Sequence, residues 1–407
     1  MAAIDRKLFL DILGFDSTSG SEKPLADYLE KALAGPVSGG VAGSAGSGPE
    51  PAVCPRVQSW DVPEGGRNLL FSWGEPRVVF CTHIDTVPPY IPPTLGESPA
   101  SVENLSSCGE ANLQKTPKMK VSPCFSGGIP SKSAKNEGET TSENSASPAD
   151  LVFGRGACDA KGQIVALYAA CRQLASEGLD GFGLLLLSGE ETGSWGAKAF
   201  AKTDFRAPYL IIGEPTEGKM VSACKGTKAF ELVFHGEAFH SGYPHFGHSA
   251  IDSFVDFVNA LRTVDFGQDP ELGPTTWNIG RLVSDNPQNV LSPELRCRLY
   301  FRTTFLSDAR VEEEVRRIAA KLAAASNHEL EITSIGGDTP SRWFTIPGFE
   351  AAPASFGSDA PHLTNFEHRA ICGAGSIRFA HRPDEQVSLA ELDEAAERYV
   401  AMFKALR

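Results

Sequence analysis

Paired cysteines, positive charge and long apolar runs are all scarce in this sequence. Nine cysteines are spread over 407 residues without a CxxC pair, which argues against a disulfide framework and favours a reducing compartment. The net charge of -14 opposes binding to nucleic acid or to an anionic membrane. No stretch approaches the ~20 apolar residues that span a bilayer, and the N-terminus lacks the apolar core of a secretory signal. We therefore expect a cytoplasmic protein with neither nucleic acid nor a membrane as partner.

The first half of the chain alternates short apolar runs with amphipathic segments. The runs at 182–188 and 209–213 are apolar almost throughout, which is typical of strands buried on both faces, and a third strand is expected at 77–82. Helices are expected at 163–177 and 194–202, between these strands. Strand and helix in alternation predict an α/β fold with a mostly parallel sheet.

The pattern changes between about 220 and 335. Strand, helix, two strands, helix and strand follow one another, and this βαββαβ order predicts a compact two-layer α+β unit of the ferredoxin-like kind. The chain then returns to the first domain and ends in a helix over 389–406. We expect one domain from residues 1–219 and 336–407, with the unit at 220–335 inserted into it.

Residues 96–148 differ in composition from the rest of the first domain. This stretch is rich in Ser, Glu, Asn, Gly and Pro, with few strongly apolar residues. It cannot build a core, so we expect a mobile surface loop or a disordered insertion.

A series of metal-binding residue types lies where strands are expected to end or helices to begin. An α/β sheet gathers such positions around one crevice, and zinc is bound by imidazole and carboxylate groups. Together they favour a site for two zinc ions in an amide hydrolase. The series consists of His83 with Asp85, Asp159, the pair Glu190 and Glu191, Glu214 and His381.

Single members of this series also have plain structural interpretations. Asp159 follows a Gly-x-Gly turn before a helix, where it can bridge two metals or simply cap the helix. Glu190 and Glu191 point in different directions, so one can bind metal while the other faces the reacting water, although an adjacent pair is often a solvated turn. His83 and Asp85 share one face of a strand, which allows the carboxylate to orient the imidazole.

Nearly the whole chain apart from the insertion resembles the zinc-dependent peptidase and deacylase family that contains acetylornithine deacetylase, succinyl-diaminopimelate desuccinylase, aminoacylase and glutamate carboxypeptidase. Six stretches carry the resemblance in family order. They are Thr82-His83-Ile84-Asp85-Thr86-Val87-Pro88-Pro89, residues 154–162, 189–197 and 213–216, His240-Ser241-Gly242-Tyr243-Pro244 and residues 379–385. The chain departs from the pattern at Gly189, where many members have Asp, and at Ala374, where many have Pro.

The resemblance implies a role for each residue of the metal series. One zinc would be held by His83 and Glu214 and the other by Glu191 and His381, with Asp159 as the bridge. Co²⁺ is an expected substitute. Glu190 would be the general base, and Asp85 would orient His83.

The resemblance also implies residues outside the metal series. His240, in the inserted domain, would reach the site of a neighbouring subunit and stabilise the oxyanion, so a homodimer through that domain is expected. The inserted domain would also act as a lid. Asn289, Arg302, Gly357 and Ser358 lie near family positions that contact the substrate carboxylate.

The expected function is metal-dependent cleavage of the amide bond of a small N-acyl amino acid, in the manner of acetylornithine deacetylase. Two alternatives stay open at this point. One is a metallo-exopeptidase, either a carboxypeptidase or a dipeptidase. The other is a catalytically silent metal-binding protein of the same fold.

Overall fold

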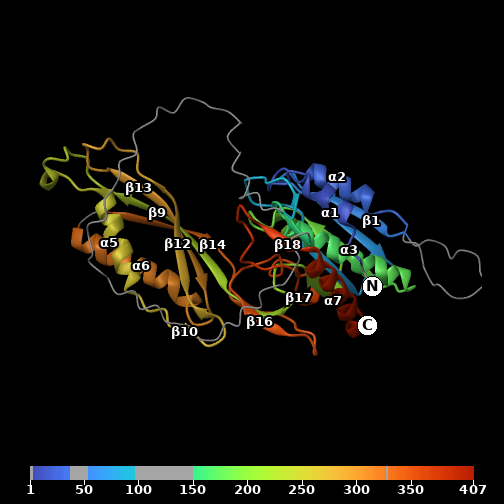
Figure 1. Ribbon diagram of the computed structural model, residues 1–407. Helices are drawn as coiled ribbons and strands as arrows, with labels where there is room; N and C mark the ends of the chain where they lie inside the picture. The colour runs from blue at the N-terminus through green and yellow to red at the C-terminus, as the bar shows by residue number, and fades with distance from the viewer. Residues whose placement is uncertain (1–2, 37–53, 97–149, 327–328) are drawn as a thin grey trace, which may run out of the picture.

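The computed structural model describes residues 3–36, 54–96, 150–326 and 329–407. The insertion expected at 96–148 therefore lies almost wholly outside the described residues. Two regions lie side by side (Figure 1). We call residues 3–225 and 337–407 the terminal region, because it holds both ends of the chain, and residues 226–336 the middle region. Within the described residues, no helix is both long and apolar enough for a membrane crossing.

A six-stranded sheet forms the centre of the terminal region. Its strands are β1 (Arg56–Asp61), β2 (Arg67–Trp73), β3 (Val78–His83), β6 (Phe182–Leu187), β7 (Ala207–Ile212) and β17 (Phe366–Ile371). They lie in the order β1-β2-β6-β3-β7-β17. The four strands from β6 to β17 are mutually parallel, whereas β2 runs antiparallel to both β6 and β1. This mostly parallel sheet confirms the predicted α/β class.

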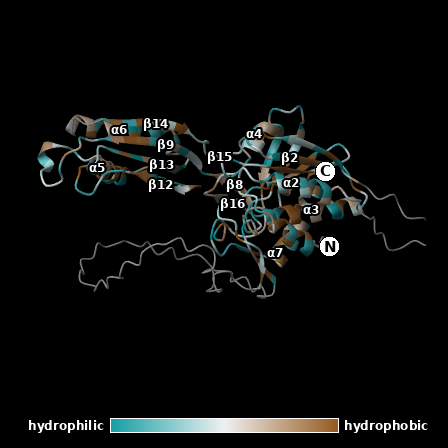
Figure 2. Cartoon of the chain, turned by 90° about the horizontal axis from the view of Figure 1, so that it is seen from above, coloured by the Kyte–Doolittle hydropathy of each residue, from teal (hydrophilic) through white to brown (hydrophobic). Residues whose placement is uncertain are grey.

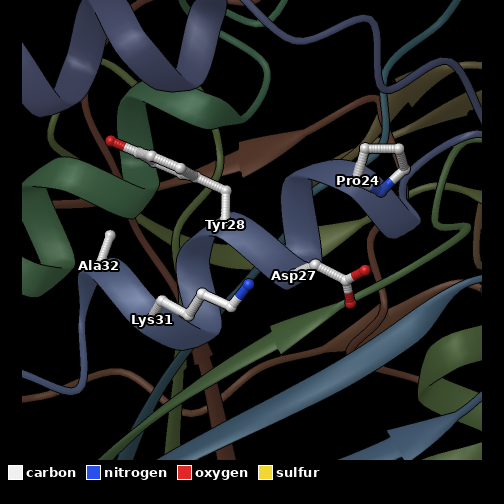
Figure 3. A pocket seen from close by; sticks show the side chains of 5 residues that line it. All are labelled: Pro24, Asp27, Tyr28, Lys31 and Ala32. Atoms are coloured by element: carbon white, nitrogen blue, oxygen red, sulfur yellow. The ribbon is translucent and has the colours of Figure 1, made fainter.

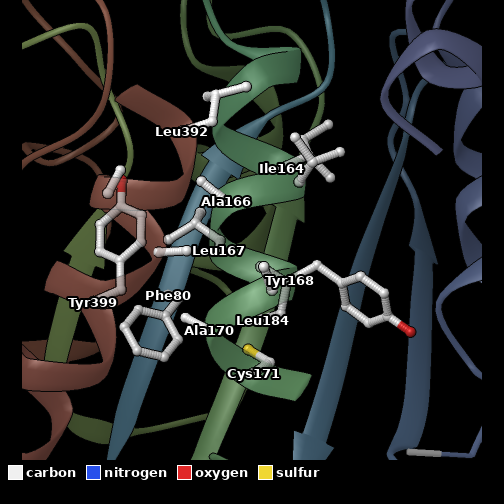
Figure 4. Close-up of a cluster of buried hydrophobic side chains, with 14 of the residues drawn as sticks. Phe80, Ile164, Ala166, Leu167, Tyr168, Ala170, Cys171, Leu184, Leu392 and Tyr399 are labelled. Carbon is white, nitrogen blue, oxygen red and sulfur yellow. The ribbon is translucent and has the colours of Figure 1, made fainter. Parts of the chain in front are cut away.

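Helices cover both faces of this sheet. They are α1 (Arg6–Leu13), α2 (Lys23–Ala32), α3 (Lys161–Ser176), α4 (Trp195–Phe200) and α7 (Leu389–Leu406). β3 and β6 are buried at every position because α1, α2, α3 and α7 pack on one face and α4 on the other. In Figure 4, Phe80 of β3, Leu167 of α3 and Tyr399 of α7 belong to one cluster of buried side chains.

The middle region is a four-stranded antiparallel sheet with two helices. In chain order its main elements are β9 (Gly226–His235), α5 (Ala250–Arg262), β12 (Thr276–Val283), β13 (Glu294–Thr303), α6 (Asp308–Ser326) and β14 (Leu330–Gly336). The strands lie in the order β12-β13-β9-β14. Alternate residues of β13 are buried, and its apolar ones share one cluster with α5 and α6. Figure 2 colours the hydrophobic residues of this region brown. This arrangement is consistent with the expected two-layer βαββαβ unit.

Two small sheets connect distant parts of the chain. β8 (Met220–Cys224) pairs with β15 (Ser341–Arg342) and β16 (Ala351–Ala354), so it joins strands that follow the middle region. β5 (Leu151–Phe153) lies between β4 (Thr94–Leu95) and β18 (Gln386–Ser388). The remaining short elements are η3 (Pro244–Phe246), β10 (Gln268–Asp269) and β11 (Gly273–Pro274). The pairing of β5 with β18 brings the chain around residue 385 next to the loop that contains Asp159.

Candidate active site

Parallel strands place three of the predicted residue groups at one edge of the sheet. His83 is the last residue of β3, and the pair Glu190 and Glu191 comes shortly after β6. Glu214 comes shortly after β7, which is the other neighbour of β3. Because β6, β3 and β7 run in the same direction, their carboxyl ends meet there.

Two imidazoles face the same carboxylate. His83 Nε2 lies 3.1 Å from Asp159 Oδ1, and His381 Nε2 lies 3.4 Å from Asp159 Oδ2. His381 Nε2 is also 2.9 Å from Glu191 Oε1. One ligand atom from each of His83, Asp159 and Glu191 lies within 4.8 Å of the other two. Asp159 therefore stands between the two histidines with one oxygen toward each, which is the arrangement of a bridging carboxylate.

The loop that holds Asp159 is fixed by Glu385. Glu385 Oε1 accepts hydrogen bonds from the amides of Gly156, Cys158 and Asp159 at 3.0 to 3.1 Å, and Oε2 accepts from Arg155 at 2.6 Å. The Glu385 side chain is fully buried, so these donors replace the water that its carboxylate gives up. Gly156 has φ +88° and its Cα lies against the side chain of Lys161, so this position requires glycine.

Asp85 connects His83 with the turn after β6. Its Oδ1 accepts from the Glu190 amide at 3.0 Å and its Oδ2 from the Glu191 amide at 3.1 Å. His83 Nδ1 is 3.0 Å from the backbone oxygen of Asp85 and 3.4 Å from Oδ1. His83 Nδ1 is thus nearer to the backbone carbonyl of Asp85 than to its carboxylate, whose oxygens accept from the two amides.

Burial and mutual proximity shift the pKa values of this cluster. Burial raises the pKa of Glu190 and Glu214 well above the ordinary range, and neighbouring carboxylates add to this effect. Burial also opposes ionisation of Asp159, but contacts with His381 and His83 outweigh it and lower its pKa. The same contacts with Asp159 and Glu191 raise the pKa of His381 to about 10. The site thus holds more carboxylates than its two imidazoles can neutralise.

This donor set fits divalent metal ions. Imidazole nitrogens and carboxylate oxygens are ligands that zinc takes. Glu214 Oε1 is buried and has no hydrogen-bond partner among the described residues, although Glu214 is close enough for its charge to interact with His83 and Asp159. A buried oxygen of this kind needs a cation or a donor beside it.

The predicted residues of the middle region lie apart from this cluster. His240 and Asn289 are exposed and adjacent, since the Ser241 amide donates to the Asn289 carbonyl at 2.9 Å. The structure brings neither into a recorded contact with the metal-type cluster. Arg302 is half-buried on β13, and its Nη1 lies 3.9 Å from where a side chain at Gly357 would begin. Ser358, next to Gly357, is buried.

Two surface hollows lie elsewhere. One, of about 450 Å³, lies along α2 (Figure 3) and is lined by Pro24, Asp27, Tyr28, Lys31 and Ala32. A second is lined by residues 206–208 and 364–367. Neither includes a predicted site residue, so the cluster at the sheet edge remains the candidate site.

A parallel sheet that gathers imidazoles and carboxylates at one edge is the framework of a metal-dependent hydrolase. A sequence profile of the peptidase family M20/M25/M40 matches residues 135–405, and the chain belongs to this family. This membership confirms the resemblance and identifies a hydrolase of peptide or amide bonds. The matched span includes Asp159, Glu190, Glu191, Glu214 and His381, and it leaves out His83 and Asp85.

Individual relatives extend the match to most of the chain. A probable carboxypeptidase of Aspergillus fumigatus is 29% identical over 378 residues, covering 86% of this chain and 76% of the relative. A tripeptidase of Staphylococcus aureus has a similar structure, with a TM-score of 0.68 at 16% identity and 99% of both chains covered. The Bacillus subtilis YXEP protein, described as a dinuclear metal-binding peptidase of the M20 family, aligns with a TM-score of 0.57 at 13% identity over 98% of this chain and 96% of its own. These two structures share the fold.

Sequence reasoning gave no role to two buried carboxylates near the cluster. Glu385 is the last residue of the stretch 379–385, which resembles the family, but nothing in the sequence indicated that its side chain faces residues 156–159. Asp359 was considered only through the backbone of its turn. Its side chain is buried, Oδ1 has no hydrogen-bond partner among the described residues, and burial raises its pKa to about 6. Asp359 stands between Ser358 and Ala360, and no local pattern there indicates a buried carboxylate.

Proposed function

We propose that this chain is a two-metal exopeptidase that releases an amino acid from short peptides with a free terminal carboxylate. The observation that carries the proposal is the placement of Asp159 between His83 and His381, with Glu191 beside it. Two imidazoles and two carboxylates from distant segments converge there, and the further carboxylates of Glu190 and Glu214 have no histidine left to balance them.

The metal ligands follow from the two sides of Asp159. His83 and Glu214 would hold one ion, Glu191 and His381 would hold the other, and Asp159 would bridge them. Zinc fits this set, and cobalt is the expected substitute. A bound metal pair supplies Lewis-acid polarisation of the substrate carbonyl and lowers the pKa of water toward ~7.

Glu190 is the proposed general base. It neighbours the ligand Glu191, and Asp85 fixes the backbone amides of both. Its carboxylate would take a proton from the attacking water and pass it to the nitrogen of the leaving amine. The amide C–N bond is then broken, the acyl carbon gains the water oxygen, and a carboxylate and an amine result.

Arg302 is the proposed partner of the substrate carboxylate, together with Asn289 and the turn at Gly357 and Ser358. Arg302 has no carboxylate within ion-pair distance among the described residues. Lys225 is a second cation close by, because the charge of Arg302 adds to the effect of burial in lowering its pKa. Two cations without an acidic neighbour favour an anionic substrate group, and the probable carboxypeptidase of Aspergillus fumigatus carries a name of the same kind.

A substrate panel tests this function. Purified protein with zinc or cobalt would be assayed on dipeptides, on the same dipeptides with an amidated C-terminus, and on N-acetyl and N-succinyl amino acids. We expect the free dipeptides to be cleaved and the amidated ones to be poor substrates. A chelator should abolish turnover, and added metal should restore it. Undiminished cleavage by metal-free protein would refute the proposal.

A small N-acyl amino acid is the second candidate substrate. The stretch Gly213-Glu214-Pro215-Thr216 favours it, since this stretch inclines the sequence toward acetylornithine deacetylase. Such substrates also carry a free carboxylate, so the same arginine would serve them. Cleavage of N-acetylornithine in preference to dipeptides would decide for this candidate.

We propose further that the middle region acts as lid and dimerisation unit, and that His240 stabilises the oxyanion in the partner subunit's site. Support comes from the exposure of His240 beside the exposed aromatic side chains of Tyr243 and Phe246. A cytoplasmic location is proposed because all seven described cysteines are free thiols.

A further inference from the structure

The segment before α2 lies against the strand end that carries the candidate site. The Thr86 amide donates to the Ser17 carbonyl at 3.0 Å, and the Ser19 amide donates to the Thr86 carbonyl at 3.2 Å. Thr18 and Thr86 form a parallel bridge. Residues 17–19 therefore extend the edge of the site as a short extra strand next to Asp85.

Ser19 adds a side-chain contact to this pairing. Its Oγ donates to Asp85 Oδ2 at 2.7 Å. The same oxygen accepts from the Glu191 amide, while Oδ1 accepts from the Glu190 amide. Asp85 is fully buried, so water cannot replace a donor that is lost. Ser19 is thus the only side-chain hydroxyl among the donors that fix this carboxylate in the described part of the chain.

The orientation of the Asp85 carboxylate determines where Glu190 and Glu191 lie. Each carboxylate oxygen holds one of the two amides, so a rotation of the carboxylate plane would move both residues. The Ser19 hydrogen bond opposes that rotation, because it gives Oδ2 a second donor beside the Glu191 amide. Charge-assisted hydrogen bonds of this length are among the stronger ones in proteins.

The turn around Ser19 is itself fixed. Gly20 has φ +94°, a conformation that favours glycine, and its amide donates to Glu22 Oε2 at 2.8 Å. The Ser21 amide donates to the Thr18 carbonyl at 2.7 Å. Glu22 is fully buried although it is charged in solution. The hydroxyl of Ser19 is therefore presented by a rigid turn, and it does not depend on a long, flexible side chain.

We propose that Ser19 is a positioning residue, which holds Asp85 so that the Glu190 carboxylate keeps the orientation needed to accept a proton from water. This inference rests on the proposed function of Glu190. The segment at 17–19 would then help to orient Glu190, although it lies outside residues 135–405, the span that matches the family.

Four variants test the inference: Ser19→Ala, Ser19→Thr, Ser21→Ala and Glu190→Gln. Ser21 is the matched control, because it lies in the same turn and its side chain is exposed. We expect Ser19→Ala to lower kcat about tenfold to a hundredfold, as for a lost hydrogen bond to a charged group, with KM changed by less than about threefold. Ser19→Thr keeps a hydroxyl and should recover most of the loss, and Ser21→Ala should match the wild type.

Metal content and the melting temperature of the metal-free protein are measured on the same samples. We expect metal content to stay at the wild-type value in Ser19→Ala and the melting temperature to fall only by a few degrees, because one hydrogen bond to a buried carboxylate is lost. A positioning role is then shown by the loss of kcat at nearly constant KM. An unchanged kcat in Ser19→Ala, an equal loss in Ser21→Ala, or no recovery in Ser19→Thr would overturn the inference. If Glu190→Gln keeps full activity, the proposed function itself fails, and this outcome is distinct from the others.

Discussion

The terminal and middle regions differ in how they hold their predicted functional residues. In the terminal region, Asp159 and the Glu190 turn are fixed by backbone amides that donate to buried carboxylates, Glu385 and Asp85. In the middle region, His240 and Asn289 are exposed on connecting segments. We propose a division of labour in which the terminal region binds the metal ions and transfers the proton, and the middle region supplies side chains to the substrate beside the turn at Gly357 and Ser358. Substitutions in the two regions should then change different kinetic parameters.

The largest effect is expected for Asp159→Ala. This change removes the carboxylate that both histidines face, so the protein should lose metal together with turnover, by on the order of 10⁴-fold or more. Metal analysis of the purified variant beside its rate of dipeptide cleavage measures both. A variant with normal metal content and normal rate would show that Asp159 is only a structural aspartate before α3.

Glu190→Gln should separate chemistry from metal binding within the terminal region. We expect kcat to fall about 10² to 10⁴-fold, the usual contribution of a general base, while metal content stays at the wild-type level. The exposed Glu64 offers a control, since Glu64→Gln makes the same change of charge on the surface. Loss of metal in Glu190→Gln would instead make Glu190 a ligand.

His240→Ala tests whether the middle region reaches a site in the partner subunit. Loss of an oxyanion donor should lower kcat about 10² to 10³-fold without loss of metal. Co-expression with Glu190→Gln subunits should restore about a quarter of the wild-type activity, because half of randomly formed dimers are mixed and each has one intact site. No recovery in verified mixed dimers would place His240 in its own subunit's site or outside any site.

Arg302→Met should affect substrate binding alone. We expect KM for dipeptides with a free carboxylate to rise about tenfold to a hundredfold, which corresponds to the loss of a charge-assisted hydrogen bond. The amidated dipeptides should be cleaved as before, and kcat should change little. An equal effect on both substrate sets would contradict the assignment of this arginine to the carboxylate.

The smallest effect concerns the core behind the site. Tyr399 is fully buried, and its hydroxyl donates to the Cys372 carbonyl at 2.8 Å. Tyr399→Phe should lower the free energy of unfolding by about 1 kcal/mol and leave kcat unchanged, as denaturant unfolding and a rate assay would show. A large loss of activity would mean that this hydrogen bond also holds the carboxyl end of β17, and with it the site, in place.

Local patterns in the sequence predicted the strongest elements. α7 was expected at 389–406 and is found there, since Ser388 and Glu391 form a capping box at its start. The apolar runs gave β6 and β7, because strands between two layers of helices need apolar residues on both faces. β1, β2 and β17 were missed, and β2 lies inside the sheet. β1 and β17 are the edge strands of the sheet and carry charged residues that solvent can reach, so their composition resembles that of a loop.

The candidate site was only partly predictable. The residue types of the metal series, and their places after strands, indicated a common edge, and the structure brings His83, Asp159, Glu191 and His381 together there. The contacts of Ser19 with Asp85 and of Glu385 with the Asp159 loop connect segments far apart in sequence, and no local pattern encodes such pairs. Likewise, the contact of His83 Nδ1 with the backbone carbonyl of Asp85 could not be predicted, because it depends on the exact course of the chain after β3.

The pairing of β5 with β18 has a consequence for biosynthesis. Residues 151–153 pair with residues 94–95 on one side and with residues 386–388 on the other, and His381 lies just before the later strand. Residues up to 388 must therefore be synthesised before the metal centre can be completed, and closing so long a loop is entropically costly and slow. Newly made molecules would pass through a stage in which four of the five proposed ligands have been synthesised and His381 has not.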